Sequence, residues 1–278
     1  MNWNTYKKHP LSLCLFLLVI LSSLFTMGLL FFLVAYILIK GIPYLSLDLF
    51  AWNYTTENVS MMPAIINTIF LTVFSLLLAV PCGIGASIYL VEYAKRGNIF
   101  VKMIRLMAET LSGIPSIVYG LFGMLCFVTA FGWNYSLLAG ACTMSIMILP
   151  LILRTTEEAL LSVPDSYREA SFGLGAGKFR TIVKIVLPAA VPGILAGVIL
   201  AIGRIVGETA ALLYTSSTIP EVAESLFDPA ETLALHMWVL SGESLYTNQA
   251  YATAVVLLVV VVLINTFSAW IARKIAKQ

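Results

Sequence analysis

The sequence predicts an all-α integral membrane protein with six transmembrane helices. Only 11% of its 278 residues are charged, and that is too few to cover a water-soluble globule, since soluble domains carry about a quarter. Long uncharged runs recur along the chain, and a helix needs about 20 mostly apolar residues to cross a bilayer. The basic residues between those runs gather on one side, as expected for cytoplasmic loops.

The uncharged runs place each helix in order. The predicted helices cover residues 11–39, 64–91, two helices within 110–153 that turn at Gly132–Tyr135, 188–216 and 250–272. The first run exceeds the core of a cleavable signal peptide, about 7–15 residues, so it is expected to remain as a transmembrane helix. A short helix is expected near 231–240, in the long segment between the last two spans.

The positions of Lys and Arg predict the orientation. With the N-terminus in the cytoplasm, fourteen of the sixteen basic residues fall on the cytoplasmic side, and both termini lie there. Lys40 falls outside, and Arg204 lies within a helix. The predicted units are 1–63 (tail, first helix and external segment), a core domain 64–272 of five transmembrane helices with a cytoplasmic loop 162–187, and a tail 273–278.

The cytoplasmic loop carries the most informative motif. Pro164 precedes a short predicted helix, and Ser166 and Glu169 fit a capping box at its start. The helix has small residues on one face and is expected to end at a group of glycines. A short helix with small residues can lie close to a partner's backbone, so the loop is expected to dock into another subunit.

The spacing of this loop resembles the EAA motif of ABC importer permeases. The matching residues are Glu169, Ala170, Ser171, Gly175, Ile185, Leu187 and Pro188. Ser171 stands where the family has alanine. The resemblance implies the six-helix, MetI-like permease fold of type I ABC importers, with the helix around Glu169 coupling the ATP-hydrolysing subunit to the membrane. The alternative, a basic loop lying on anionic lipid, would not produce the glycine and Ile-x-Leu-Pro spacing.

The chain itself lacks an ATP-binding motif. Gly177-Lys178 is the closest approach to a P-loop, but Phe172 stands where its first glycine belongs and Phe179 where a hydroxyl would hold Mg²⁺. The chain is therefore expected to be non-catalytic and to bind no cofactor, with ATP and Mg²⁺ used by a partner subunit. The four cysteines and two histidines match no metal-ligand spacing, so no metal site is expected.

Two charged residues interrupt the predicted fifth helix. Arg204 and Glu208 are four residues apart, so a continuous helix would put them on one face, beyond the membrane midplane toward the outside. A charge at the bilayer centre costs about 2.5–3.5 kcal/mol on insertion scales and usually marks a transport pathway. Arginine can bind oxyanions bidentately. The alternative is an intrahelical ion pair that only fixes packing.

Two segments resemble the phosphate-specific transport permeases. They are 203–214, which contains Arg-x-x-Gly-Glu-Thr-Ala, and 111–123, which resembles that family's third-span motif. The first is closer to the A-type subunit, although Ala211 replaces an expected proline. The resemblance assigns Arg204, Glu208 and Thr209 to the substrate pathway. The flanking glycines and Pro115 could equally form a kinked packing surface.

The resemblance also implies a complex in a bacterial cell membrane. Its members would be a second homologous permease, two ATP-binding subunits and an extracytoplasmic phosphate-binding protein, with no nucleic-acid partner. Three alternatives remain open: an ABC permease for another oxyanion such as sulfate or molybdate, or for a small organic solute; an ion-coupled secondary transporter; and a membrane-embedded enzyme. The last would need a cluster of His, Asp or Cys, which the sequence does not offer.

Overall fold

The computed structural model describes residues 10–95 and 97–275, and within these ranges the regular structure is entirely helical. The main helices are α2 (Pro10–Gly41), α3 (Met62–Ile88), α4 (Ile99–Ser112), α5 (Ser116–Gly123), α6 (Leu137–Leu161), α7 (Asp165–Gly173), α8 (Lys178–Thr181), α9 (Leu187–Val206), α10 (Ala210–Leu213), α11 (Leu233–Gly242) and α12 (Thr247–Ile275). Three of them continue as π-helical turns, α3 into Tyr89–Tyr93, α5 into Met124–Ala130 and α8 into Ile182–Val186. Short 3₁₀ turns occupy Ile42–Tyr44, Leu47–Phe50 and Ser244–Tyr246.

Among the described residues, five helices are long and apolar enough to cross a membrane, and a sixth crossing is a bent pair. The pair is α4 with α5 and its π turn, which meet at 101°. The prediction that a single helix starts near Thr110 is therefore wrong. Pro115 has no N–H to continue the α4 hydrogen-bond ladder, and Gly113 has a low helix propensity. The chain therefore turns between these two residues.

The fifth helix is also shifted from its predicted range of 188–216. The helical path runs from Lys178 to Val206, so each end lies ten residues earlier than the sequence indicated. Its first turns carry basic residues and were assigned to the loop, because Pro188 was taken as the helix start. Pro188 instead lies within the path, at the start of α9, and Gly207 ends the helix.

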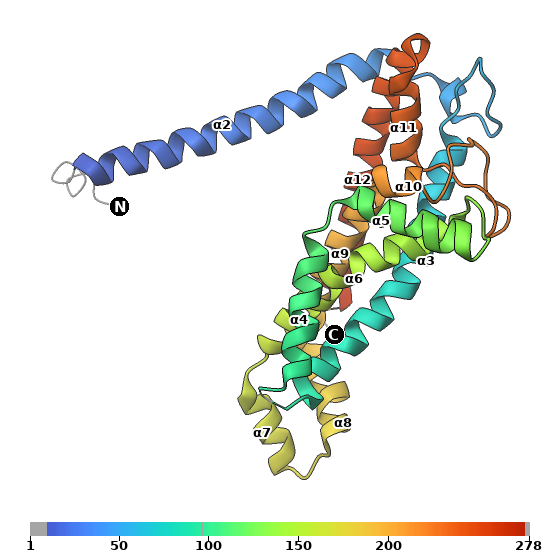
Figure 1. Cartoon of the computed structure of the whole chain (residues 1–278). Coiled ribbons are helices and arrows are strands. Elements are labelled where there is room, and N and C mark those ends of the chain that lie inside the picture. The colour runs from blue at the N-terminus through green and yellow to red at the C-terminus, as the bar shows by residue number, and fades with distance from the viewer. Residues whose placement is uncertain (1–9, 96, 276–278) are drawn as a thin grey trace.

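Helix α6 lies at the centre of the bundle, between α3 and α9 (Figure 1). Gly83 of α3 lies against Ile152, and Ser87 donates a hydrogen bond of 2.8 Å to the carbonyl of Leu153. On the other side, Gly197 of α9 lies against Thr155. These glycines have no side chain, so the helix backbones approach closely and the three helices form a firm core.

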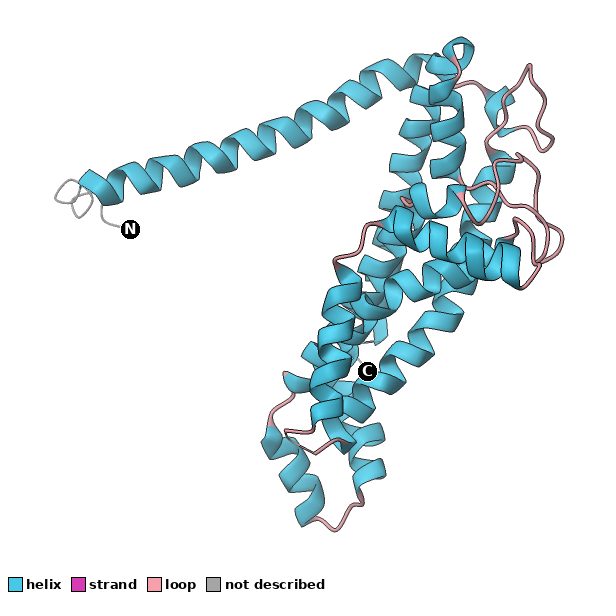
Figure 2. Ribbon diagram, viewed as in Figure 1, coloured by secondary structure: helices cyan, strands magenta, loops and turns pink. Residues whose placement is uncertain are grey.

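Helix α2 stands away from the bundle and meets it near its C-terminal end (Figure 2). There, Gly41 lies against the backbone of Tyr251, and the ring of Tyr36 contacts the ring of Tyr251 edge-on. None of the most apolar window of α2 is buried within the chain. Its apolar surface must therefore be covered by lipid or by another subunit.

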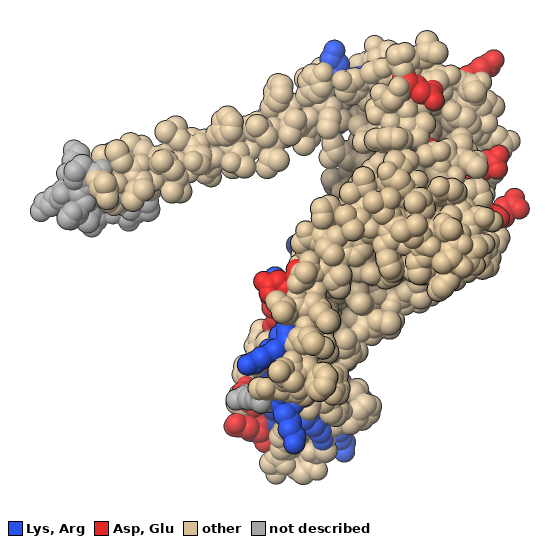
Figure 3. Space-filling model, viewed as in Figure 1, with Lys and Arg blue, Asp and Glu red and all other residues tan. Residues whose placement is uncertain are grey.

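Charged residues gather at the two ends of the bundle (Figure 3). Lys and Arg concentrate around α7 and α8, which we call the basic end. The opposite end carries α11 and the segments 42–61 and 214–232, with Glu57, Glu221, Glu224 and Glu243, and we call it the acidic end. The short helix predicted near 231–240 is confirmed there as α11.

Candidate functional site

Arg204 lies in the last turn of α9, but Glu208 does not share that helix. The helix ends at Val206, and Gly207 separates it from the short α10. Glu208 accepts a hydrogen bond of 3.1 Å from the backbone N–H of Ala211, and among the described residues no ion pair joins it to Arg204. The prediction that the two residues lie on one continuous helix is therefore wrong.

The antiparallel register of α6 and α9 sets the depth of Arg204. Gly193 lies opposite Ala159 and Gly197 opposite Thr155, which puts Arg204 level with Ile148. Ile148 is near the middle of α6, so Arg204 lies beside the middle of the central helix. The helical path that carries Arg204 begins about three turns before Pro188, the residue from which the sequence-based depth was counted.

Arg204 lines a cavity of about 290 Å³ between α4, α6 and α9. Its side chain is half-buried, and no described residue forms a hydrogen bond or ion pair with it. The cavity wall comprises Arg105, Ala108, Glu109, Ser112, Pro150, Leu151, Leu153, Arg154, Glu157 and Arg204. An arginine without a partner at this depth is costly, so the cavity is suited to an anion that would pair with it.

Two further arginines of the cavity are already paired. Arg105 of α4 forms an ion pair of 2.5 Å with Glu157, and Arg154 forms one of 3.1 Å with Glu158 on the same helix. Sequence reasoning missed these residues because they flank the apolar runs and were counted as loop charges. The amphipathic pattern of 99–112, with Arg105 and Glu109 on one side, was the signal that could have found them.

The two segments that resemble phosphate-specific permeases pack against each other. A side chain at Gly120 of α5 would lie 2.9 Å from the Cα of Ala211 in α10. One at Gly123 would clash with Thr143 and Thr215. The third-span motif is thus a kinked packing surface that fixes α10 beside the end of α9. Thr209 occupies the N-cap position of α10 without a side-chain capping bond.

The loop at the basic end forms α7, as predicted, but without the capping box. Asp165 is the first helical residue, which puts Ser166 inside the helix, and no side-chain capping bond is present. Glu169 and Ala170 are exposed. The next motif residue, Ser171, is buried and shares a hydrogen bond of 2.8 Å with Thr181 of α8.

A groove of about 530 Å³ runs between α7 and the segment that follows it. Gly175 turns the chain there with φ of +79°, a conformation that favours glycine. The groove is lined by Tyr167, Ala170, Ser171, Leu174, Gly175, Ala176, Arg180, Lys184 and Ile185. Ile185 therefore borders the groove, whereas Leu187 and Pro188 begin α9. The structure brings these motif residues together around α7 and keeps them apart from Arg204.

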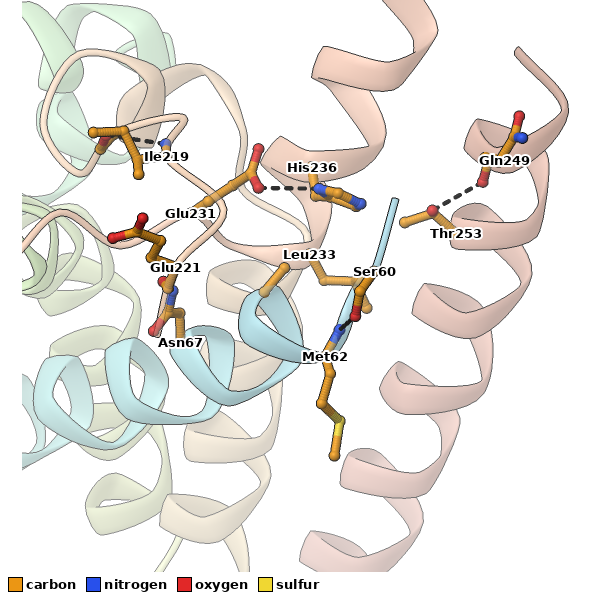
Figure 4. A network of polar contacts seen from close by, with 12 residues as sticks. Ser60, Met62, Asn67, Ile219, Glu221, Glu231, Leu233, His236, Gln249 and Thr253 are labelled. Atoms are coloured by element: carbon orange, nitrogen blue, oxygen red, sulfur yellow. Dashed lines mark hydrogen bonds and ion pairs between the residues drawn. The ribbon is translucent and has the colours of Figure 1, made fainter. Parts of the chain in front are cut away.

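A polar network at the acidic end holds the segment 214–232 onto α3 (Figure 4). The side-chain amide of Asn67 donates to the carbonyl of Glu221 at 2.7 Å and accepts from the N–H of Ala223 at 3.0 Å. Glu231 and His236 are almost fully buried and are 3.0 Å apart. Burial raises the pKa of the Glu231 carboxyl, and its contact with His236 partly offsets that rise. Within the described residues, no cluster of His, Cys, Asp and Glu is suited to a metal ion.

Comparison with known proteins gives consistent results. Residues 79–277 match the family model described as binding-protein-dependent transport system inner membrane component. The chain is 33% identical to a probable ABC transporter permease of Bacillus subtilis, YqgI, covering 88% of this chain and 89% of that one. It is 34% identical to the phosphate transport system permease protein PstA of Haemophilus influenzae, covering 82% of each.

Solved structures show the same fold. A bacterial alginate ABC transporter in complex with a pentasaccharide-bound periplasmic protein matches 98% of each chain, with a TM-score of 0.71 and 17% identity. The MetNI methionine ABC transporter in an inward-facing conformation matches 77% of this chain and 93% of that one, with a TM-score of 0.58 and 20% identity. The predicted type I importer fold is thereby confirmed.

Proposed function

This chain belongs to the family of binding-protein-dependent transport system inner membrane components, and from that premise we propose that it imports inorganic phosphate past Arg204. Membership makes it a multi-pass inner-membrane permease subunit of an ABC importer. The phosphate assignment goes further. It is supported by the permease PstA at 34% identity and by the geometry around Arg204.

The observation that carries the proposal is the unpaired guanidinium in the cavity. Arg204 has no hydrogen-bond or ion-pair partner within the described residues, and the cavity that it lines is large enough for a small anion. A guanidinium presents a planar fork of donors that matches two oxygens of a phosphate ion. A tetrahedral oxyanion is therefore the ligand that Arg204 is best suited to bind.

The carboxylates around the cavity keep that binding weak enough for transport. Glu157 pairs with Arg105 at 2.5 Å, and Glu109 lies on the same wall. An anion that enters would compete with Glu157 for Arg105, so part of its attraction offsets the loss of an existing ion pair. Binding that is favourable but not deep allows the anion to leave on the other side.

Glu208 and Thr209 support this site through α10. Glu208 caps the N–H of Ala211, and Ala211 packs on Gly120 of α5. The contact holds the end of α9 against the bent crossing. We assign Glu208 and Thr209 to positioning this part of the pathway, with Arg204 as the residue that contacts the anion.

The proposed importer also requires partner subunits. The exposed Glu169 and Ala170 would enter a cleft of a separate ATP-hydrolysing subunit, one of two, and the basic end would then face the cytoplasm with both termini. Helix α2, whose apolar surface is uncovered by its own chain, is suited to wrap a second permease. An extracytoplasmic phosphate-binding protein would dock on the acidic end.

The test measures uptake of labelled phosphate and sulfate in cells that lack this chain, with and without the chain restored on a plasmid. Arg204→Ala is expected to lower phosphate uptake by at least about 100-fold, since a charge-assisted bidentate contact contributes about 3 kcal/mol. Arg204→Lys, which keeps the charge but loses the fork, is expected to fall between Arg204→Ala and the parent. Immunoblotting of membranes checks that each variant is present at parental levels.

Three outcomes would redirect the assignment. Rescue of sulfate or molybdate uptake instead of phosphate would favour a permease for another oxyanion. Unchanged uptake with Arg204→Ala would remove Arg204 from the pathway. Uptake that persists without any copurifying ATPase would favour ion-coupled transport, which the family membership opposes.

A further inference from the structure

At the basic end, the side chain of Arg168 joins three helices. Its Nε and Nη2 donate to Glu92 Oε1 at 3.0 and 2.7 Å, and Glu92 lies in the π turn that continues α3. Its Nη1 donates to the carbonyl of Val163 at 2.7 Å, and Nη2 also donates to the carbonyl of Leu160 at 3.0 Å. Leu160 is in the last turn of α6, whose final carbonyls have no partner within the helix.

The contact is mostly buried, unlike most ion pairs among the described residues. The side chain of Arg168 is 14% exposed and that of Glu92 is 8% exposed, whereas Arg154 and Glu158 are 66% exposed. The guanidinium donates twice to the same oxygen of Glu92, and moving it away would leave that carboxylate and the carbonyl of Val163 without this partner. Arg168 therefore joins α7 to the ends of α3 and α6.

The residue stands beside the motif that was assigned to ATPase docking. Glu169 and Ala170 follow Arg168 directly on α7 and are exposed, while Arg168 points inward. On the far side of α7, Ser171 is bonded to Thr181, which belongs to the helical path of α9. One helix thus connects an exposed surface to both α6 and α9, the two helices that carry Glu157 and Arg204.

We propose that Arg168, through Glu92 and the carbonyl of Leu160, transmits the movement of α7 to α3 and α6, so that ATP hydrolysis reshapes the cavity at Arg204. Arg168 is a positioning residue and does not touch the transported solute. When the contact is lost, α7 can still follow its ATPase subunit and stays joined to the helical path of α9 through Ser171 and Thr181, but α3 and the end of α6 no longer follow α7. The inference rests on the proposed ATP-driven import.

The test uses the assembled complex, with its ATPase subunits and partner permease, in proteoliposomes. Labelled phosphate uptake and ATP hydrolysis are measured together for the parent and for Arg168→Gln and Glu92→Gln. Both variants are expected to keep hydrolysing ATP while phosphate moved per ATP falls about tenfold, a typical size for coupling between sites. Arg273→Gln is the matched control, since it removes a basic residue that is exposed at the end of α12.

A purely structural role predicts a different result. Poor assembly would lower uptake and hydrolysis in proportion and leave phosphate per ATP unchanged, which would overturn the proposal. If Arg168→Gln does not assemble, Arg168→Lys takes its place. It keeps the ion pair with Glu92 but cannot reach both carbonyls, and an unchanged ratio in both Glu92→Gln and Arg168→Lys would also overturn the proposal.

A second measurement does not depend on the solute. Ser112, at the cavity wall, is replaced by cysteine in a chain whose own four cysteines are removed, and its rate of thiol labelling is compared with and without ATP. ATP is expected to change the rate in the parent and in Arg273→Gln but not in Arg168→Gln. If the parent shows no phosphate uptake, the proposed substrate fails, and this comparison still decides the role of Arg168.

Discussion

The two ends of the bundle each bury a contact between an acidic and a basic side chain, but the two contacts differ in reach. At the basic end, Arg168 bonds Glu92, 76 positions away, the carbonyl of Leu160 in α6 and the carbonyl of Val163 just after that helix. At the acidic end, Glu231 and His236 are five positions apart and bond each other. The first contact joins separate helices, whereas the second fixes one loop against the helix that follows it.

The contacts also differ in what surrounds the carboxylate. The Glu92 carboxylate accepts two hydrogen bonds from the guanidinium of Arg168. The Glu231 carboxyl is almost fully buried, and burial raises its pKa, while its contact with His236 partly offsets that rise. The raised pKa of Glu231 makes the stability of the acidic end depend on pH.

The largest stability effect is expected from breaking the contact at the basic end. Arg168→Ala leaves the buried Glu92 carboxylate and the carbonyl of Val163 unpaired, and should lower stability by about 3 kcal/mol. The double variant Glu92→Leu with Arg168→Leu should lose less, because no buried charge remains. Thermal unfolding of the purified complex checks both. An equal loss in the two would show that packing, not pairing, dominates.

A smaller loss is expected at the acidic end. His236→Ala removes the partner of a buried carboxyl and also the ring that contacts Tyr54, so it should cost about 2 kcal/mol. Glu231→Gln keeps a hydrogen-bond acceptor for His236 and should cost less. The same thermal measurement applies, and a larger loss for Glu231→Gln would mean that the carboxylate charge is required.

The acidic end should also respond to pH. Because burial raises the folded-state pKa of Glu231, the folded chain keeps a proton that the unfolded chain has lost. Stability should therefore be highest below the ordinary Glu pKa and fall as the pH rises through the raised value. Unfolding temperatures measured across that range should show this decline in the parent and a weaker one in Glu231→Gln. Identical profiles would refute it.

The smallest effect is expected from the exposed pair of Arg154 and Glu158. Both side chains are 66% exposed, so solvent screens their attraction. Glu158→Gln should change stability by about 0.3–0.5 kcal/mol, close to the error of a thermal measurement. A loss as large as that of Arg168→Ala would mean that burial does not explain the difference between the pairs.

Much of the fold could be predicted from single residues and runs. The spans 64–91 and 250–272, the turn at Gly132–Tyr135 and the helix after Pro164 follow from hydropathy and turn residues, and the structure confirms them. A kink at Pro115 was an open alternative, but the first arm of the bent crossing, Ile99–Ser112, was missed because its charged residues placed it in a loop. Hydropathy records the composition of a run but not whether its helix continues.

The candidate site was likewise predictable only in part from the sequence. The unusual Arg204 was visible in the sequence because a charge within an apolar run is costly and rare. Its cavity was not visible, since Arg105 comes from α4 and had been counted as a loop charge, and Glu157 comes from the end of α6. The contact between Arg168 and Glu92 likewise depends on two residues that are far apart in the chain.

By itself, the sequence determined the class of protein, most of its crossings and the short helix that carries the EAA-like motif, because these depend on local composition and on spacing along one helix. The tertiary structure decided which charges meet. It separated Glu208 from Arg204 by ending α9 at Val206, and it brought Arg168 to Glu92. Such pairings depend on how helices pack, and helix packing depends on the contacts of the whole chain at once.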